Sequence, residues 1–198
     1  MDRLPEETAR VFPVYSQRDP RWAETHLGYP DAARDSTLGR YGCAVASLAM
    51  LLSHYSRYKT PPEVNADLVK HSGFRTDATR NLLNWQKLPL IYSEIKRVRR
   101  LDFLSRDPNA VEMAGLSDWL SARKPVILKV DGNPATRTLD EHFVAGVGEL
   151  ESGIVVADPY TGSLKPLREF CLTGKPHRQT DAAAIWAILY FDFELPQF

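Results

Sequence analysis

An apolar segment from Ala44 to Leu52 constrains the fold more than any other feature of this sequence. Apart from Ser47 it is apolar on every side, and its alanine, leucine and methionine residues are good helix formers. A helix that is apolar all round must be buried against the rest of the chain. Gly42 allows a tight turn into this segment, so we expect a central helix that begins next to Cys43.

Weaker patterns predict the elements around this helix. Residues 1–40 are punctuated by proline and glycine, which indicates mostly irregular structure. Further helical patterns lie at 62–71, 77–86 and 110–123. Apolar segments rich in β-branched residues predict strands at 126–130, 143–147, 154–157 and 185–191. Helices followed by strands with short turns indicate an α+β fold with a mainly antiparallel sheet, and we expect residues 1–198 to form a single domain.

The composition excludes several classes of protein. Hydrophobic residues make up 43% of the 198, enough for a core, and 25 basic residues balance 25 acidic ones. No basic run is longer than Lys96-Arg97, so nothing points to a nucleic-acid partner. No apolar run approaches the length of a membrane span. The N-terminus lacks the apolar core of a signal peptide, which predicts a cytoplasmic protein; a secreted mature form and a phage-associated protein stay open.

Cys43 lies where the start of a helix favours a thiolate. Unpaired backbone N–H groups and the helix dipole stabilise negative charge at that position, which is what a thiol nucleophile needs. The simpler interpretation is a small buried residue at the start of a core helix, because free cysteine is often buried. The helix pattern alone leaves both interpretations open.

A histidine and an aspartate far downstream add to the case for a nucleophile. His142 opens one predicted strand and Asp158 ends the next, with a short turn at Glu151-Ser152-Gly153 between them, as in a β-hairpin. If paired residue numbers sum to 302, Asp158 lies opposite Val144, on the same face as His142 and diagonal to it. A sum of 300 places it directly opposite His142, and an odd sum separates the two. The simpler interpretations are a histidine at a strand end and an Asp-Pro turn.

Other residues fit these roles less well. His54 is about 16 Å from Cys43 along the same predicted helix, too far for a general base. Cys171 does not stand at the start of a predicted helix, so we expect it to have a structural role. Two cysteines are too few for a disulfide framework. No cysteine or histidine pair has zinc-ligand spacing and no phosphate-binding glycine loop is present, so we expect no metal and no cofactor.

Five stretches of the chain resemble papain-like cysteine peptidases. More narrowly, they resemble the group that contains the peptidase domains that trim double-glycine leaders from bacteriocins. The resemblance spans about residues 12–163, and its strength lies in the order and spacing of the motifs. The stretches are Tyr15–Trp22, Gly42-Cys43 with its apolar helix, 120–127, Glu141–Val144 and Val156–Pro159.

The resemblance implies a role for each candidate residue. Cys43 would be the nucleophile, His142 the base and acid, and Asp158 the group that orients His142. Gln17 would donate to the oxyanion together with the backbone N–H of Cys43, because a tetrahedral oxyanion needs fixed donors. The implied fold is papain-like, with helices around a buried nucleophile helix that packs on an antiparallel sheet.

The chain departs from the leader-trimming group near the cysteine. That group usually places its glutamine a few residues before the cysteine, whereas here Gln17 lies far upstream, in a Gln-x-Asp-x-x-Trp pattern that also contains Asp19 and Trp22. We expect those two residues to fix the loop that carries Gln17. On residues alone, Gln17 would be an exposed polar side chain. The 198 residues contain none of the transporter domains that often accompany that group, so we do not expect bacteriocin processing to be the specific function.

Three functions remain open at this stage. The first is a cysteine peptidase that hydrolyses a peptide or isopeptide bond through a thioester, with a peptide or protein substrate such as a peptidoglycan peptide. The second is an acyltransferase that uses the same site to pass the acyl group to an amine or thiol. The third is a binding module without catalytic activity on a peptidase-like fold.

Overall fold

The computed structural model describes residues 12–55, 58–77, 79–136, 139–171 and 180–194. The α-helices in these ranges are α2 (Leu38–Tyr41), α3 (Cys43–His54), α4 (Pro61–Lys70), α5 (Leu88–Ile91), α6 (Ala110–Ser121) and α7 (Asp181–Ala184). The 3-10 helices are η1 (Trp85–Lys87) and η2 (Leu167–Phe170). The strands are β1 (Ile95–Asp102), β2 (Val126–Asp131), β3 (Glu141–Leu150), β4 (Gly153–Asp158), β5 (Ser163–Pro166) and β6 (Ala187–Phe193).

The predicted central helix is present as α3, and it is buried as its composition requires. Every residue from Val45 to Leu52 is buried, Ser47 included. The Ser47 hydroxyl donates to the carbonyl oxygen of Phe143 at 3.1 Å, so its polar atom is satisfied within the core. This bond also ties the second turn of α3 to the start of β3.

The strands form one antiparallel sheet in the order β1-β6-β2-β3-β4-β5. Its two faces carry separate cores, since neighbouring residues of a strand point to opposite sides. One face packs on α3 and contributes Ile127 and Ala145, while the other packs on α6 and contributes Leu128 and Val144. The expected α+β class with a mainly antiparallel sheet is confirmed.

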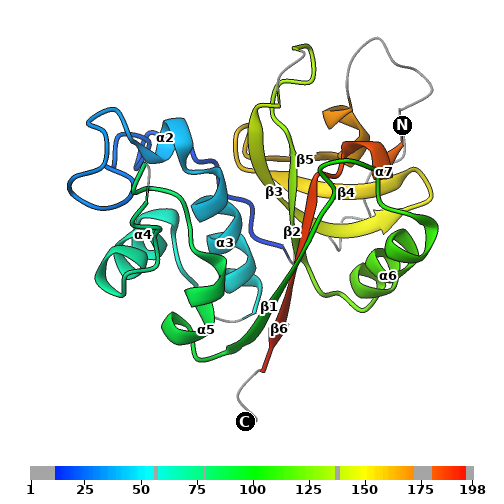
Figure 1. Cartoon of the computed structure of the whole chain (residues 1–198), viewed down its shortest axis with the longest axis horizontal. Helices are drawn as coiled ribbons and strands as arrows, with labels where there is room; N and C mark the ends of the chain where they lie inside the picture. The colour runs from blue at the N-terminus through cyan, green and yellow to red at the C-terminus, as the bar shows by residue number, and fades with distance from the viewer. Residues whose placement is uncertain (1–11, 56–57, 78, 137–138, 172–179, 195–198) are drawn as a thin grey trace.

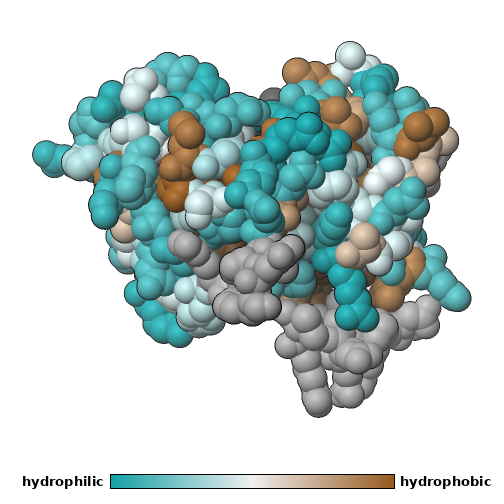
Figure 2. Space-filling model, turned by 90° about the horizontal axis from the view of Figure 1, so that it is seen from below, coloured by the Kyte–Doolittle hydropathy of each residue, from teal (hydrophilic) through white to brown (hydrophobic). Residues whose placement is uncertain are grey.

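The arrangement in space follows from this order (Figure 1). Helices α2 to α5 gather on one side, strands β2 to β5 with α6 and α7 lie on the other, and α3 runs beside the sheet. The face shown in Figure 2 is mainly hydrophilic, with its hydrophobic side chains in small separate groups. Among the helices of the described residues, none combines the length and apolar character that crossing a bilayer requires.

The helix predicted over 77–86 is wrong for the part of that segment that the structure describes. Leu83 is extended and bridges to Phe74, and Arg80 has a positive φ of 59°. The Asn81 amide donates to the Ser36 hydroxyl at 2.7 Å, so tertiary contacts outweigh a weak local helical preference. Helical turns begin only with η1 and continue as α5, where Pro89 stands in the first turn.

Strand β1 has no counterpart among the predicted strands. Its sequence, Ile95–Asp102, is dominated by charged residues and shows no alternation, because it is an edge strand with most side chains in solvent. Cross-strand ion pairs support it, with Arg97 at 2.9 Å from Asp192 and Lys96 at 2.7 Å from Glu194. Strand β5 at the other edge was also not predicted from the sequence.

Candidate active site

Cys43 is the first residue of α3, and a tight connection from α2 sets its position. Gly42 joins the two helices, and a Cβ atom there would lie 2.4 Å from the carbonyl oxygen of Leu38. A larger residue at 42 would therefore push the two helices apart. The Cys43 side chain is half-buried and is a free thiol, so it is both held and accessible.

His142 and Asp158 meet through the predicted hairpin. Ala145 pairs with Ala157 and Gly146 with Val156, which confirms the register sum of 302 at this end of the hairpin. His142 Nε2 and Asp158 Oδ1 lie 2.6 Å apart, and both side chains are buried. The β-bulge that follows Gly146 shifts the pairing only beyond this point.

Asp158 has three further partners, none of which was expected from the sequence. Its Oδ1 accepts from the backbone N–H of Tyr160 at 2.9 Å, and its Oδ2 accepts from the Thr161 hydroxyl at 3.0 Å. Lys165 on β5 places its ammonium 2.8 Å from Oδ2. The carboxylate is therefore fixed by four donors, counting His142, and cannot rotate without losing several of them.

Phe170 packs against two members of this cluster, Lys165 and His142. The Lys165 ammonium lies 4.8 Å from the centre of its ring, and the His142 ring lies 5.9 Å from it. Each member of this group therefore contacts two others: Asp158 contacts Lys165 and His142, and Phe170 contacts the same two residues. A buried carboxylate and imidazole are held in one geometry by neighbours that supply both charge and packing.

The charges of the pair stabilise one another. Burial alone would lower the pKa of His142, but hydrogen bonds with Asp158 and Cys43 and the charges of those groups outweigh it and raise the pKa to about 9. Burial alone would raise the pKa of Asp158, but hydrogen bonds from His142 and Lys165 hold it well below its ordinary value. Since Nε2 faces Asp158, Nδ1 is the ring nitrogen left for Cys43.

Gln17 is buried rather than exposed, with 2% of its surface accessible. Its Nε2 donates to the carbonyl oxygen of Gly39 at 3.1 Å, and its backbone N–H donates to the carbonyl oxygen of Pro159 at 2.7 Å. The second bond ties the Gln17 loop to the residue after Asp158. An amide nitrogen carries two N–H groups, so Nε2 keeps a second one beyond its bond to Gly39.

The two neighbours of Gln17 in the Gln-x-Asp-x-x-Trp pattern support the loop in different ways. Trp22 is buried and its indole N–H donates to the carbonyl oxygen of Ser16 at 2.8 Å, as expected for a residue that fixes the loop. The carboxylate of Asp19 pairs with Arg21 at 2.7 Å, on the outside of the turn. Trp22 therefore anchors the loop to the core, while Asp19 shapes its outer turn.

The remaining candidates lie where the sequence predicted. His54 is at the opposite end of α3 from Cys43. Cys171 is buried, its thiol donates to the carbonyl oxygen of Thr180 at 3.2 Å, and burial raises its pKa. Among the described residues, no group of three or more histidine, cysteine, aspartate or glutamate side chains has a metal-binding arrangement.

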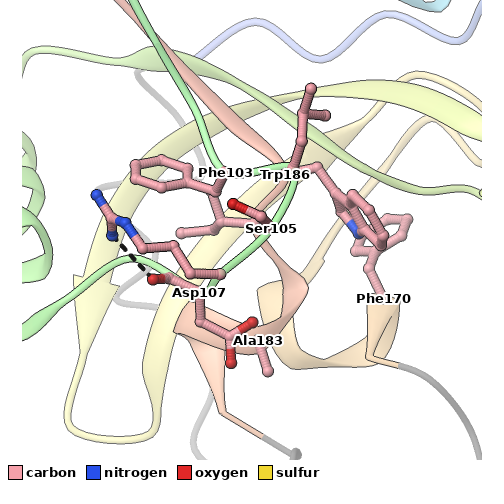
Figure 3. A pocket seen from close by; sticks show the side chains of 9 residues that line it. Phe103, Ser105, Asp107, Phe170, Ala183 and Trp186 are labelled. Atoms are coloured by element: carbon pink, nitrogen blue, oxygen red, sulfur yellow. Dashed lines mark hydrogen bonds between the residues drawn. The ribbon is translucent and has the colours of Figure 1, made fainter.

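A separate small pocket lies on the sheet side of the molecule (Figure 3). Its walls come from the segment after β1, from Phe170 and from the residues before β6, and they enclose about 190 Å³. Arg106 at its edge pairs with Glu112 at 2.6 Å and donates to the carbonyl oxygen of Asp107, the bond drawn in Figure 3. Phe170 is shared with the His142 cluster, but the lining residues include no thiol or imidazole.

Three solved structures are similar to the chain at low sequence identity. A protein described as a C39-like peptidase from Bacillus anthracis is 16% identical, with 76% of this chain and 88% of that one covered and a TM-score of 0.48. The peptidase domain of Streptococcus ComA, a bifunctional ABC transporter in a quorum-sensing pathway, is 16% identical, with 77% and 91% covered and a TM-score of 0.44. A double-glycine-motif protease from an AMS/PCAT transporter, solved with its leader peptide, is 18% identical, with 77% and 84% covered and a TM-score of 0.43.

Sequence comparison gives a more direct result. No curated protein sequence matches the chain. The model of the Peptidase_C39 like family matches residues 11–171, which contain every candidate residue of the site. The papain-like peptidase resemblance of the sequence is confirmed by this match, and the chain belongs to the Peptidase_C39 like family.

Proposed function

We propose that the chain is a cysteine peptidase that hydrolyses a peptide or isopeptide bond through a thioester acyl-enzyme. The observation that carries this proposal is the buried His142–Asp158 pair, 2.6 Å apart, with Cys43 at the start of α3 close enough to help raise the pKa of His142. Membership of a peptidase family supports it. The arrangement supplies a nucleophile, a base and a group that orients the base.

In the first half of the reaction the Cys43 thiolate attacks the carbonyl carbon of the scissile bond. The tetrahedral oxyanion accepts hydrogen bonds from the second N–H of Gln17 Nε2 and from the backbone N–H of Cys43. Protonated His142 gives its proton to the leaving nitrogen as the C–N bond breaks. The products of this step are a free amine and a thioester on Cys43.

In the second half neutral His142 takes a proton from water, whose oxygen attacks the thioester carbonyl. The C–S bond breaks, the acid product leaves, and the thiolate and protonated His142 are restored. Asp158 keeps the imidazole ring in one orientation throughout, with Nδ1 toward Cys43. No step needs a metal or an organic cofactor.

Cleavage profiling of a diverse peptide library tests this proposal, with wild-type protein compared with Cys43→Ala. We expect new N-termini with the wild type and none with the variant. A peptide aldehyde should block labelling of Cys43 by a thiol-reactive probe. Added amine acceptors separate hydrolysis from acyl transfer, since transfer yields amide products. If Cys43→Ala cleaves as well as the wild type, the proposal is wrong.

A further inference from the structure

Three arginines lie close in sequence to Gln17 or Cys43, and they differ in how their charges are balanced. Arg21 pairs with Asp19, and Arg40 pairs with Asp35. Arg18, next to Gln17 in the chain, is exposed and makes no ion pair with the described residues. Its charge is therefore available at this side of the site.

Arg18 is nevertheless held in place. Its backbone N–H donates to the Ser16 hydroxyl at 3.1 Å, and the bond between Gln17 and Pro159 fixes the neighbouring residue. Its guanidinium lies over the ring of Tyr160, 4.7 Å from the ring centre. No side-chain hydrogen bond joins the guanidinium to the described residues, so its N–H groups can bind another group.

Tyr160 connects this cation to the reacting groups. The centres of the Tyr160 and His142 rings lie 6.4 Å apart, with 88° between the ring planes, so the contact is edge-on. The backbone N–H of Tyr160 donates a hydrogen bond to Asp158. About half of the tyrosine surface is exposed. Arg18 is thus two ring contacts away from the proposed general base.

We propose that Arg18 recognises a carboxylate of the peptide substrate close to the scissile bond. This inference rests on the proposed peptidase function and adds the chemical class of the substrate. Guanidinium and carboxylate groups match in a planar, two-point hydrogen bond, and no other side-chain cation offers that geometry. The carboxylate would come from an aspartate or glutamate side chain or from the C-terminus of the peptide.

Cleavage profiling of two peptide libraries tests the proposal, one with free C-termini and one with amidated C-termini. We expect a preference of about fivefold for a carboxylate at one position, because the contact is partly exposed to solvent. Enrichment of Asp and Glu at a fixed distance from the cleaved bond identifies a side-chain carboxylate. Faster cleavage of the free-acid library near its C-termini identifies a terminal carboxylate.

Three variants separate recognition from general damage. Arg18→Gln should remove the preference while cleavage of neutral peptides persists, and Arg18→Glu should favour Lys or Arg at the same position. Arg123→Gln is the control, because Arg123 is exposed just beyond α6, on the other face of the sheet from α3. It should keep the wild-type preference.

The outcomes distinguish the two proposals. Cleavage without any carboxylate preference, or a preference that survives Arg18→Gln, overturns the role of Arg18 and leaves the peptidase function standing. A complete lack of cleavage by the wild type in both libraries counts against the peptidase function itself.

Discussion

The two sides of the active site hold their functional groups in different ways. On the sheet side, His142 is bonded to Asp158, which Lys165 and two further donors fix in turn. On the helix side, Cys43 is placed by the backbone at the start of α3, and the Gln17 side chain makes one hydrogen bond with the described residues. The sheet side fixes side-chain orientation, whereas the helix side fixes the backbone.

This difference fits the separate demands of the two groups. A general base must keep one tautomer and one ring orientation, and a buried charge needs partners, so a network of side chains suits it. A nucleophile must reach the substrate, and an oxyanion donor must keep an N–H group free for the transition state. The Cys43 side chain is half-buried and the His142 side chain is buried, in line with these demands.

The largest expected effect is on the helix side. Cys43→Ala should reduce peptide turnover on the order of 10⁶-fold, because the remaining groups cannot form the thioester. Cys171→Ala is the matched control and should keep activity, since its thiol faces Thr180. Limiting iodoacetamide at pH 6.5, followed by peptide mass spectrometry, should modify Cys43 first. Preferential modification of Cys171 would contradict the assignment of the nucleophile.

The next largest effect tests whether the sheet side acts as a network. Asp158→Ala should reduce turnover on the order of 10⁴-fold, and His142→Ala should reduce it more. Asp158→Asn should recover part of the loss, because an amide oxygen can accept from His142. Its amide N–H₂ would face the Lys165 ammonium, where the carboxylate accepts now.

Adding a second substitution sharpens that test. Lys165→Met places an apolar group where the ammonium lies near Phe170, and it removes the positive charge that Asp158→Asn leaves unbalanced. The double variant Asp158→Asn/Lys165→Met should therefore turn over faster than Asp158→Asn alone, although Lys165→Met alone lowers turnover. Steady-state kinetics on all four proteins gives the coupling. Additive effects would show that Lys165 does not act through Asp158.

A smaller effect is expected at the oxyanion donor. Gln17→Ala should lower turnover about 100- to 1,000-fold with little change in KM, since the lost bond forms in the transition state. The folded state should survive, because the side chain makes one hydrogen bond to a loop carbonyl. Circular dichroism and thermal melting check the fold beside the kinetics. Turnover close to wild type would mean that another group stabilises the oxyanion.

The sequence predicted those parts of the site that depend on strong local patterns. The helix after Cys43 is apolar all round, and it forms at nearly the expected bounds. The hairpin that brings His142 and Asp158 together has a short turn and β-branched strands. Two even registers place the two residues on one face of the sheet, and the structure has one of them. The burial of Gln17 was missed, because it depends on contacts with distant residues.

Lys165 was missed because strand β5 has only four residues, none of them buried, and so lacks an apolar pattern. A signal was nevertheless present in the turn before it. Gly162 has a positive φ of 67°, as a tight turn between two strands requires, and Asp158 pairs with Ser163 across that turn. Lys165 then lies opposite Val156, diagonal to Asp158 on the same face. The reasoning that joined His142 to Asp158 would have found this contact.

The remaining expected effect is on the free energy of unfolding rather than on turnover, and it tests the charge on the sheet side directly. The pKa of His142 is raised from an ordinary 6.5 to about 9. A group whose pKa is higher in the folded state stabilises the fold fully below its ordinary pKa and loses that contribution as pH rises through the folded value. The His142 charge should therefore stabilise the fold on the order of 3 kcal/mol at pH 6, and this should fade toward pH 9.

Urea unfolding of the wild type and of His142→Gln at several pH values measures this contribution. The stability advantage of the wild type should shrink between about pH 6.5 and 9, because only the wild type carries the imidazolium. An NMR titration of the His142 ring adds a direct reading. Cys43→Ala should lower the pKa of His142, since Cys43 is one of the two groups that raise it against the effect of burial. If His142 titrates near 6.5 in the wild type, the sheet side does not stabilise a charged imidazolium, and the contrast drawn between the two sides of the site is wrong.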